Sequence, residues 1–289
     1  MPSHRFLLTL ALLFAWPAAV AAEEARLTLL HTTDLHGALT TWDYLGDQPG
    51  LGGLARIATL VERARAENTP VLLLDNGDAI QGSPLTTVWH TGFSQGKEPV
   101  MAAMARMGYD AMAVGNHEFS FGPGALARAR ADAGFPFLAA NVTREPGGAA
   151  AFDSSLIRTV GPLKVGIVGV CTAATPALED SANVAGFGFH SPIDAARREV
   201  ERLKARGCDL VVLLAHTGLG AERVAGEARD ENLGERLARE VPGADVVILG
   251  HTHAVIDSLR IGQALVTQAG ARGEQLGRVD LTFRRASAA

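Results

Sequence analysis

Five short apolar runs of the sequence end in residue types that bind metal ions. Their endings are "TTDLHG", "NGD", "GNHE", "AHTG" and "GHTH". Carboxylates, an amide oxygen and imidazoles together suit Zn, Mn, Fe or Co, and they argue against an all-oxygen calcium site. The predicted ligands are Asp34, His36, Asp78, Asn116, His216, His251 and His253. This set is too large for one ion, so we expect two divalent ions about 3.5–4 Å apart that share a carboxylate.

The apolar runs that carry these residues are predicted to be buried strands. They are rich in Val, Ile and Leu and apolar nearly throughout, as strands covered on both faces are. Segments with apolar residues at helical spacing separate them; one of these opens on the capping residue Ser191 before Pro192 and ends at Gly207. This alternation predicts an α/β fold. Ligands of such sheets bind outside the carboxyl ends of the strands, so distant residues should converge on one rim.

The remaining histidines and cysteines are assigned to other roles. A single histidine at a strand end is usually only a hydrogen-bonded polar residue. His31, within the first run, is expected to be structural or to contact the metal ligands without binding metal itself. His90 and His190 are expected on the surface or in loops. Cys171 and Cys208 would lie at opposite ends of two parallel strands, beyond the Cα separation of about 7 Å that a disulfide allows, so we expect free thiols. No Lys or Arg stands out as a phosphate clamp.

Residues 1–22 have the pattern of a secretory signal. His4 and Arg5 precede an apolar run, and small residues follow up to Ala22. The run is shorter than the about 20 residues of a membrane-spanning helix, so we expect a periplasmic or secreted protein without a membrane anchor after cleavage. Residues 23–289 contain no long linker or repeat and are expected to form one domain.

Composition limits the classes of partner. The chain is 47% hydrophobic and 20% charged, as folded globular proteins are. Its formal net charge is −5, and removal of the signal would take away Arg5 and no acidic residue. Without a basic patch, binding to nucleic-acid polymers is not expected.

In their order along the chain, "TTDLHG", "NGDAIQGSP", "GNHEF", "AHTG" and "GHTH" resemble the motifs of the calcineurin-like metallophosphoesterases. More narrowly, they are similar to the catalytic domain of exported 5′-nucleotidases and of 2′,3′-cyclic-nucleotide 2′-phosphodiesterase/3′-nucleotidases. The resemblance extends from about Leu27 to about Ile256. It implies a four-layer αββα sandwich and makes residues 23–289 a metallophosphoesterase catalytic domain.

The resemblance also implies a role for each motif residue. The first metal would be held by Asp34, His36, Asp78 and His253. The second would be held by Asp78, Asn116, His216 and His251, with Asp78 bridging the two. Asn116 and His117 are the catalytic candidates, and His117 would stabilise charge on the phosphoryl group or the leaving oxygen without binding metal. The two ions would turn water into a hydroxide nucleophile that attacks phosphorus.

Two departures from the family pattern bear on the substrate. The 5′-nucleotidases typically place an Asp after "GNHEF" that pairs with the catalytic histidine, whereas this chain has Ser120 there. The cyclic phosphodiesterases also lack that Asp, so in this respect the chain resembles them. Both groups normally carry a large C-terminal domain that grips the nucleoside, and this sequence ends at Ala289 without one. Recognition would then come from aromatic residues near the metal loops. These candidates are Trp42, Tyr44 and Phe119, with Trp89 and Phe121 as further members.

The expected function is an exported phosphohydrolase for a small phosphate ester, with a 2′,3′-cyclic-nucleotide phosphodiesterase/3′-nucleotidase as the first hypothesis. A 5′-nucleotidase or a broad-specificity phosphomonoesterase is the alternative. A thiosulfohydrolase shares the architecture but also has the C-terminal domain. A non-enzymatic metal-binding surface protein is disfavoured because the ligand set is complete.

Overall fold

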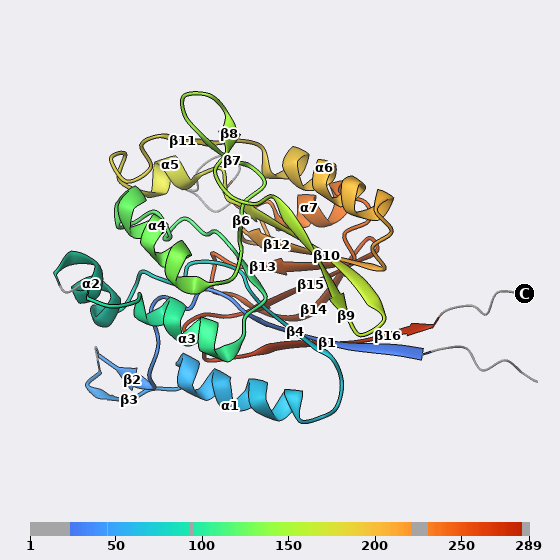
Figure 1. Ribbon diagram of the computed structural model, residues 1–289, viewed down its shortest axis with the longest axis horizontal. Helices are drawn as coiled ribbons and strands as arrows, with labels where there is room; N and C mark the ends of the chain where they lie inside the picture. Colours follow the sequence, from blue (N-terminus) through green and yellow to red (C-terminus); the bar gives the residue numbers. More distant parts are fainter. Residues whose placement is uncertain (1–23, 45, 93–94, 221–230, 285–289) are drawn as a thin grey trace, which may run out of the picture.

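The computed structural model describes residues 24–44, 46–92, 95–220 and 231–284, and the signal predicted at residues 1–22 lies outside them. Two β-sheets occupy its centre (Figure 1). The first sheet consists of β1 (Glu24–Thr32), β4 (Val71–Asp75), β5 (Ala111–Ala113), β6 (Phe137–Leu138) and β16 (Gly277–Arg284). The second consists of β9 (Ser155–Val160), β10 (Leu163–Cys171), β12 (Leu210–His216), β13 (Val246–Leu249), β14 (Val255–Ile261) and β15 (Ala264–Ala269).

Each sheet has a parallel centre. The strand orders are β16-β1-β4-β5-β6 and β14-β15-β13-β12-β10-β9. Strands β1, β4, β5 and β6 pair in parallel in the first sheet, as do β15, β13, β12 and β10 in the second. The edge strands β16, β14 and β9 pair antiparallel with their neighbours. All the strands that precede predicted ligands belong to the parallel centres, so their carboxyl ends share one rim.

Helices cover the outer faces of the two sheets (Figure 1). The helices against the first sheet are α1 (Leu54–Arg65), α3 (Pro99–Met107) and α4 (Gly122–Ala133). Those against the second are α6 (Pro192–Ala205) and α7 (Gly234–Glu240). Successive residues of β1 face different cores: Leu29 packs between the sheets, and Leu30 packs with Ile57 of α1. Three apolar cores therefore separate four layers, and the predicted αββα fold is confirmed.

Helix α6 shows how the sequence sets a local element. The side chain of Ser191 accepts a hydrogen bond from the backbone N–H of Asp194 (3.2 Å), and Pro192 occupies the first turn. Val200 and Leu203 are fully buried against the second sheet. Gly207, just after the helix, has a φ of 76°, which glycine adopts without steric cost.

Other segments differ from the sequence-based expectation. A small sheet of order β11-β7-β8, which the sequence analysis did not predict, lies outside the two main sheets. Its strands are β7 (Val142–Arg144), β8 (Ala149–Ala150) and β11 (Phe187–Phe189). Further short elements are α2 (Pro84–Thr91), α5 (Thr175–Leu178), β2 (Trp42–Asp43) and β3 (Gln48–Pro49). Strands β15 and β16, the last two among the described residues, belong to different sheets.

The two cysteines are buried and free, as predicted. Cys171 is paired in register with His216 at the carboxyl end of β12, whereas Cys208 precedes the start of that strand. Within the described ranges, no helix combines the length and apolar character that crossing a membrane requires.

Candidate metal centre

The backbone is left-handed at most of the predicted ligands. Residues other than glycine rarely adopt a positive φ, and such strain persists only where the surrounding structure enforces it, most often at functional sites. The φ angles are 53° at Asp34, 47° at His36, 58° at Asp78, 69° at His251 and 56° at His253. The loops after β1, β4 and β13 are therefore bent to aim these side chains at one another.

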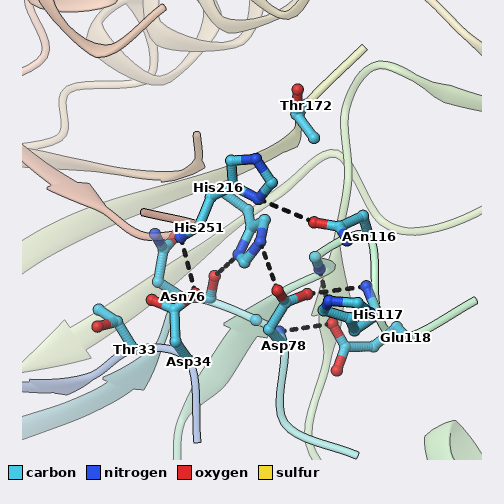
Figure 2. Close-up of polar contacts among 12 residues, drawn as sticks. Thr33, Asp34, Asn76, Asp78, Asn116, His117, Glu118, Thr172, His216 and His251 are labelled. Carbon is cyan, nitrogen blue, oxygen red and sulfur yellow. Dashed lines mark hydrogen bonds and ion pairs between the residues drawn. The ribbon is translucent and has the colours of Figure 1, made fainter. Parts of the chain in front are cut away.

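The ligand side chains form two groups. Ligand atoms of Asp34, His36 and His253 all lie within 4.8 Å of one another, and the same holds for Asp78, His216 and His251. Asp78 also forms a group of this size with His36 and His117. Figure 2 shows Asp34, Asp78, Asn116, His216 and His251 converging from both sheets. Asp78 thus lies between the two groups, where a bridging ligand belongs.

In the first group, two imidazoles face each other. Nε2 of His36 lies 2.8 Å from Nε2 of His253. The other ring nitrogen of His36 donates to the backbone carbonyl of Gln81 (2.8 Å), which leaves the lone pair of Nε2 directed into the group. Burial lowers the pKa of His36 to about 4, so the ring is neutral and able to bind metal at neutral pH.

In the second group, His216 is oriented by the opposite sheet. Its Nδ1 donates to the backbone carbonyl of Asn76 (2.6 Å), and its Nε2 lies 3.1 Å from Oδ2 of Asp78. Burial opposes the charged ring, but the carboxylates of Asp78 and Asp34 raise the pKa of His216 to about 10. The carboxylates of Asp78 and Asp34 therefore favour a positive charge beside them.

His251 and Asn116 complete the second group. Nδ1 of His251 lies 3.0 Å from Oδ1 of Asn116, and its backbone N–H donates to Oδ1 of Asp34 (2.7 Å). Nε2 of His251 is 2.9 Å from Oε1 of Glu231. Asn116 is 2% exposed, so its amide oxygen is presented inside the cluster rather than to solvent.

The donor set fits divalent cations. Oδ2 of Asp34 is buried and has no hydrogen-bond partner, which is costly for a carboxylate oxygen unless a ligand satisfies it. Burial, and then the nearby Asp78, raises the pKa of Asp34 to about 7. A cation beside Asp34 and Asp78 would give the buried Oδ2 a partner and would stabilise the ionised carboxylates. The mixed oxygen and nitrogen ligands suit several transition metals.

Glu118 has a structural role that the sequence did not suggest. It is fully buried; Oε2 accepts hydrogen bonds from the backbone N–H groups of Asp78 (2.8 Å) and Gly115 (2.7 Å), and Oε1 accepts from Ala79 (2.7 Å). One carboxylate therefore fixes the loops after β4 and β5 to each other. A Cβ atom on Gly115 would collide with Oδ1 of Asp78, which explains the glycine. The position of Glu118 within "GNHEF" was the available signal.

His117 is held beside the metal groups by a carboxylate from a distant segment. Its Nδ1 lies 3.0 Å from Oε1 of Glu179 and 3.0 Å from Oγ of Ser120, and its backbone N–H donates to Oδ1 of Asp78 (2.8 Å). Burial opposes a charged ring, but the hydrogen bond to the carboxylate of Glu179 and the charge of Asp78 give a net rise in the pKa of His117. Nothing in the sequence around Glu179 pointed to this contact.

Next to the first group is a cavity of about 570 Å³. Its lining includes His36, Trp42, Tyr44 and Arg272. Trp42 and Tyr44 are 44% and 48% exposed. The structure thus places these two predicted substrate contacts at the rim of the candidate centre.

Phe119 does not share this position, so its predicted substrate contact is wrong. It is fully buried, and its ring lies 5.0 Å from that of Phe187 and 5.2 Å from that of Phe189. It anchors the "GNHEF" loop to strand β11. Trp89 is also buried, beneath Arg128.

The three other histidines among the described residues have distinct environments. His31 is buried in β1 with Thr267 nearby, in a structural position as predicted, and His190 is exposed. The surface position predicted for His90 is wrong: its side chain is fully buried, lies 3.7 Å from Glu98 and stacks on Phe121. Helix α2, which the sequence analysis did not predict, turns this residue inward.

Arg272 lies at the cavity, although no arginine was predicted there. Its backbone N–H donates to the carbonyl of Asp34 (2.8 Å), and its φ is 56°. The pKa of His253 is lowered by burial and, among the charges around it, by that of Arg272. Among the described residues, its guanidinium makes no side-chain hydrogen bond or ion pair, so its charge is available to an anion in the cavity.

The chain is similar in sequence to characterised proteins. Residues 27–255 match the family model described as calcineurin-like phosphoesterase. The chain is 36% identical over 267 residues to snake venom 5′-nucleotidase of Gloydius brevicauda, covering 88% of this chain and 42% of that protein. It is also 36% identical over 255 residues to the 2′,3′-cyclic-nucleotide 2′-phosphodiesterase/3′-nucleotidase of Salmonella typhimurium, covering 82% of this chain and 38% of that protein.

A solved structure has a similar overall fold. The calcineurin-like phosphoesterase YfkN from Bacillus subtilis superposes with a TM-score of 0.80 at 29% identity, covering 92% of this chain and 87% of that one. Against the two curated relatives, the chain spans about two fifths of their length.

Proposed function

The chain belongs to the calcineurin-like phosphoesterase family and is a metal-dependent phosphoesterase, and on this premise we propose that it is an exported hydrolase of nucleotides. The specific activity proposed is that of a 2′,3′-cyclic-nucleotide phosphodiesterase/3′-nucleotidase. One observation carries the proposal: Asp78 lies between two groups of ligand atoms, each spanning no more than 4.8 Å. This is the arrangement that two-metal hydrolases use.

The chain's own residues would hold the two ions in distinct sets. Asp34, His36 and His253 would bind the first ion, and Asn116, His216 and His251 the second, with Asp78 shared. When bound, such ions activate water and neutralise the charge of the phosphate oxygens.

His117 is the proposed proton donor. Its side chain is 33% exposed, whereas His36, Asp78 and Asn116 beside it are buried, so it is open to a substrate. The raised pKa favours the protonated ring that a general acid requires. In this role it gives a proton to the leaving alcohol oxygen as the bond to phosphorus breaks.

The cavity beside His36 is the proposed seat of the nucleoside. Trp42 and Tyr44 expose ring area there that can stack on a base. Arg272 supplies a positive charge next to His253, where a second anionic group of the substrate would be stabilised.

Ser120 favours the cyclic-nucleotide activity, because in the family pattern the 5′-nucleotidases carry an Asp at this position. The 36% identity to a 5′-nucleotidase makes that activity the second candidate. The proposed location is the periplasm or the exterior, on the basis of the signal pattern in residues 1–22.

The test is a parallel assay of metal-reconstituted protein with 2′,3′-cyclic AMP, 3′-AMP, 5′-AMP and bis-(p-nitrophenyl) phosphate. We expect the highest kcat/KM with the cyclic nucleotide. Preference for 5′-AMP would transfer the assignment to the second candidate, and no hydrolysis of any compound would refute the proposed function.

A further inference from the structure

Glu179 makes three contacts with residues of the loop after β5. It follows helix α5, and its side chain is only 6% exposed. Oε1 lies 3.0 Å from Nδ1 of His117 and accepts a hydrogen bond from Nδ2 of Asn116 (3.1 Å). Oε2 accepts from the hydroxyl of Ser120 (2.8 Å). Both carboxylate oxygens are thus committed to this loop.

From this geometry we propose that Glu179 is the positioning carboxylate of His117, supplied from a remote segment to the place where the 5′-nucleotidases typically have an Asp and this chain has Ser120. The inference rests on the proposed phosphohydrolase function. It goes beyond that function, because no sequence motif or family position assigns a role to Glu179.

The contacts determine how two side chains are presented. The hydroxyl of Ser120 donates its proton to Glu179, so it accepts from Nδ1 of His117, and Oε1 of Glu179 lies equally close to that nitrogen. Nδ1 of His117 therefore carries a proton, and Nε2 remains for the substrate. The same carboxylate takes a proton of the Asn116 amide, which fixes the amide so that Oδ1 faces His251. Glu179 therefore couples the orientation of the proposed proton donor to that of a proposed metal ligand.

A second tie keeps this carboxylate in place. Asn183 lies four residues beyond Glu179, and its Nδ2 donates to the backbone carbonyl of Ser120 (2.6 Å). The backbone N–H of Glu179 itself donates to the carbonyl of Thr175 in α5 (3.1 Å). The segment after β10 is thus fastened to the loop after β5 on both sides of His117.

The role has a defined place in the reaction. The oxygen of a hydroxide forms a bond to phosphorus as the bond between phosphorus and the leaving oxygen breaks. The electron pair of the broken bond stays on the leaving oxygen, and the proton of Nε2 of His117 moves to it. Glu179 remains a carboxylate throughout and stabilises the protonated ring. Its effect should be large for an alcohol, which leaves poorly without a proton, and small for p-nitrophenolate, which leaves without one.

The variant E179Q keeps the size of the side chain and removes its charge. We expect kcat for 3′-AMP to fall on the order of 10²-fold while kcat for p-nitrophenyl phosphate changes less than about 3-fold, with KM little altered. The double variant E179Q/S120D returns a carboxylate to Nδ1 of His117 and should recover most of the loss. The control is D180N, one residue along, where an exposed side chain keeps its oxygen for the N–H of Ala182.

A second readout needs no bound metal and no turnover. In NMR spectra of ¹⁵N-labelled metal-free protein at alkaline pH, the ring of His117 should have a protonated Nδ1 and an unprotonated Nε2. In E179Q the same ring should shift toward a mixture of the two tautomers. The signals of His117 are identified by their loss in H117Q. Unchanged signals in E179Q, or equal loss of kcat with both substrates, would overturn the inference. If wild-type protein hydrolyses no phosphate ester, the proposed function fails, while the spectra still decide whether Glu179 positions His117.

Discussion

The backbone carbonyl of Asn76 lies 2.6 Å from Nδ1 of His216, and this contact joins the two sheets at the candidate centre. Asn76 follows β4 of the first sheet, and His216 ends β12 of the second. The side chain of Asn76 also donates to the carbonyl of Ala215 (3.0 Å). The packing of the two sheets therefore sets which nitrogen of His216 faces Asp78, and the ligand geometry depends on the whole fold.

Substitution of Asp78 should affect both ions, because its carboxylate lies between the two groups. We expect D78N to retain less than one ion per chain after dialysis, measured by elemental analysis. D34N, which changes a ligand of the first group only, should retain about one. Two ions per chain in D78N would contradict the bridging role.

Glu118 should matter for stability more than its absence from the ligand set suggests. Its two oxygens accept three backbone N–H groups in the core, and a glutamine offers only one oxygen. E118Q should lower the free energy of unfolding by about 1–3 kcal/mol in urea denaturation, since buried donors lose their acceptor. E62Q, on the exposed side of α1, is the matched control and should change it by less than about 0.5 kcal/mol.

Asp75 gives the fold a defined pH dependence. Burial raises the pKa of its carboxyl from the ordinary 3.8 to about 8 in the folded protein. Between these values the native state holds a proton that the unfolded chain has released, so the free energy of unfolding falls as pH rises through this window. D75N keeps an oxygen for the N–H of Gly77 and cannot ionise.

The variant should therefore gain stability relative to the wild type as pH rises. The measurement is urea denaturation of both metal-free proteins at about pH 5 and pH 9. Parallel pH profiles for the two proteins would show that the Asp75 carboxyl is not the group responsible.

The cavity beside His36 predicts a substrate effect that separates binding from chemistry. Tyr44 lines it and is 48% exposed. Y44A should raise KM for nucleotides several-fold and leave KM for p-nitrophenyl phosphate unchanged, because the small ester has no base to stack. L60A, an exposed apolar residue of α1 that does not line the cavity, should change neither. An equal rise in KM for both substrates in Y44A would place the nucleoside elsewhere.

Sequence patterns were informative where structure is local. Buried strands are recognisable from their apolar runs, and a ligand-type residue at the end of such a run, as at Asp34 or His216, must lie at the rim. The capping of α6 by Ser191 depends on neighbouring residues only. These features could be predicted because each is set within a few residues.

Features set by contacts between distant segments could not be predicted. Phe119 is buried because Phe187 and Phe189 pack on it. Glu179 contacts His117, although the two residues are 62 positions apart in the sequence. Arg272 meets the cavity only because the segment between β15 and β16 crosses from one sheet to the other. Neither composition nor periodicity carries this information.

The most direct test of the two-metal account is to titrate metal-free protein with Mn²⁺ while following bis-(p-nitrophenyl) phosphate hydrolysis and the number of ions bound per chain. We predict no hydrolysis without metal and full activity when two ions are bound, with D78N inactive throughout. Hydrolysis by the metal-free protein, or full activity with a single ion bound, would contradict the account.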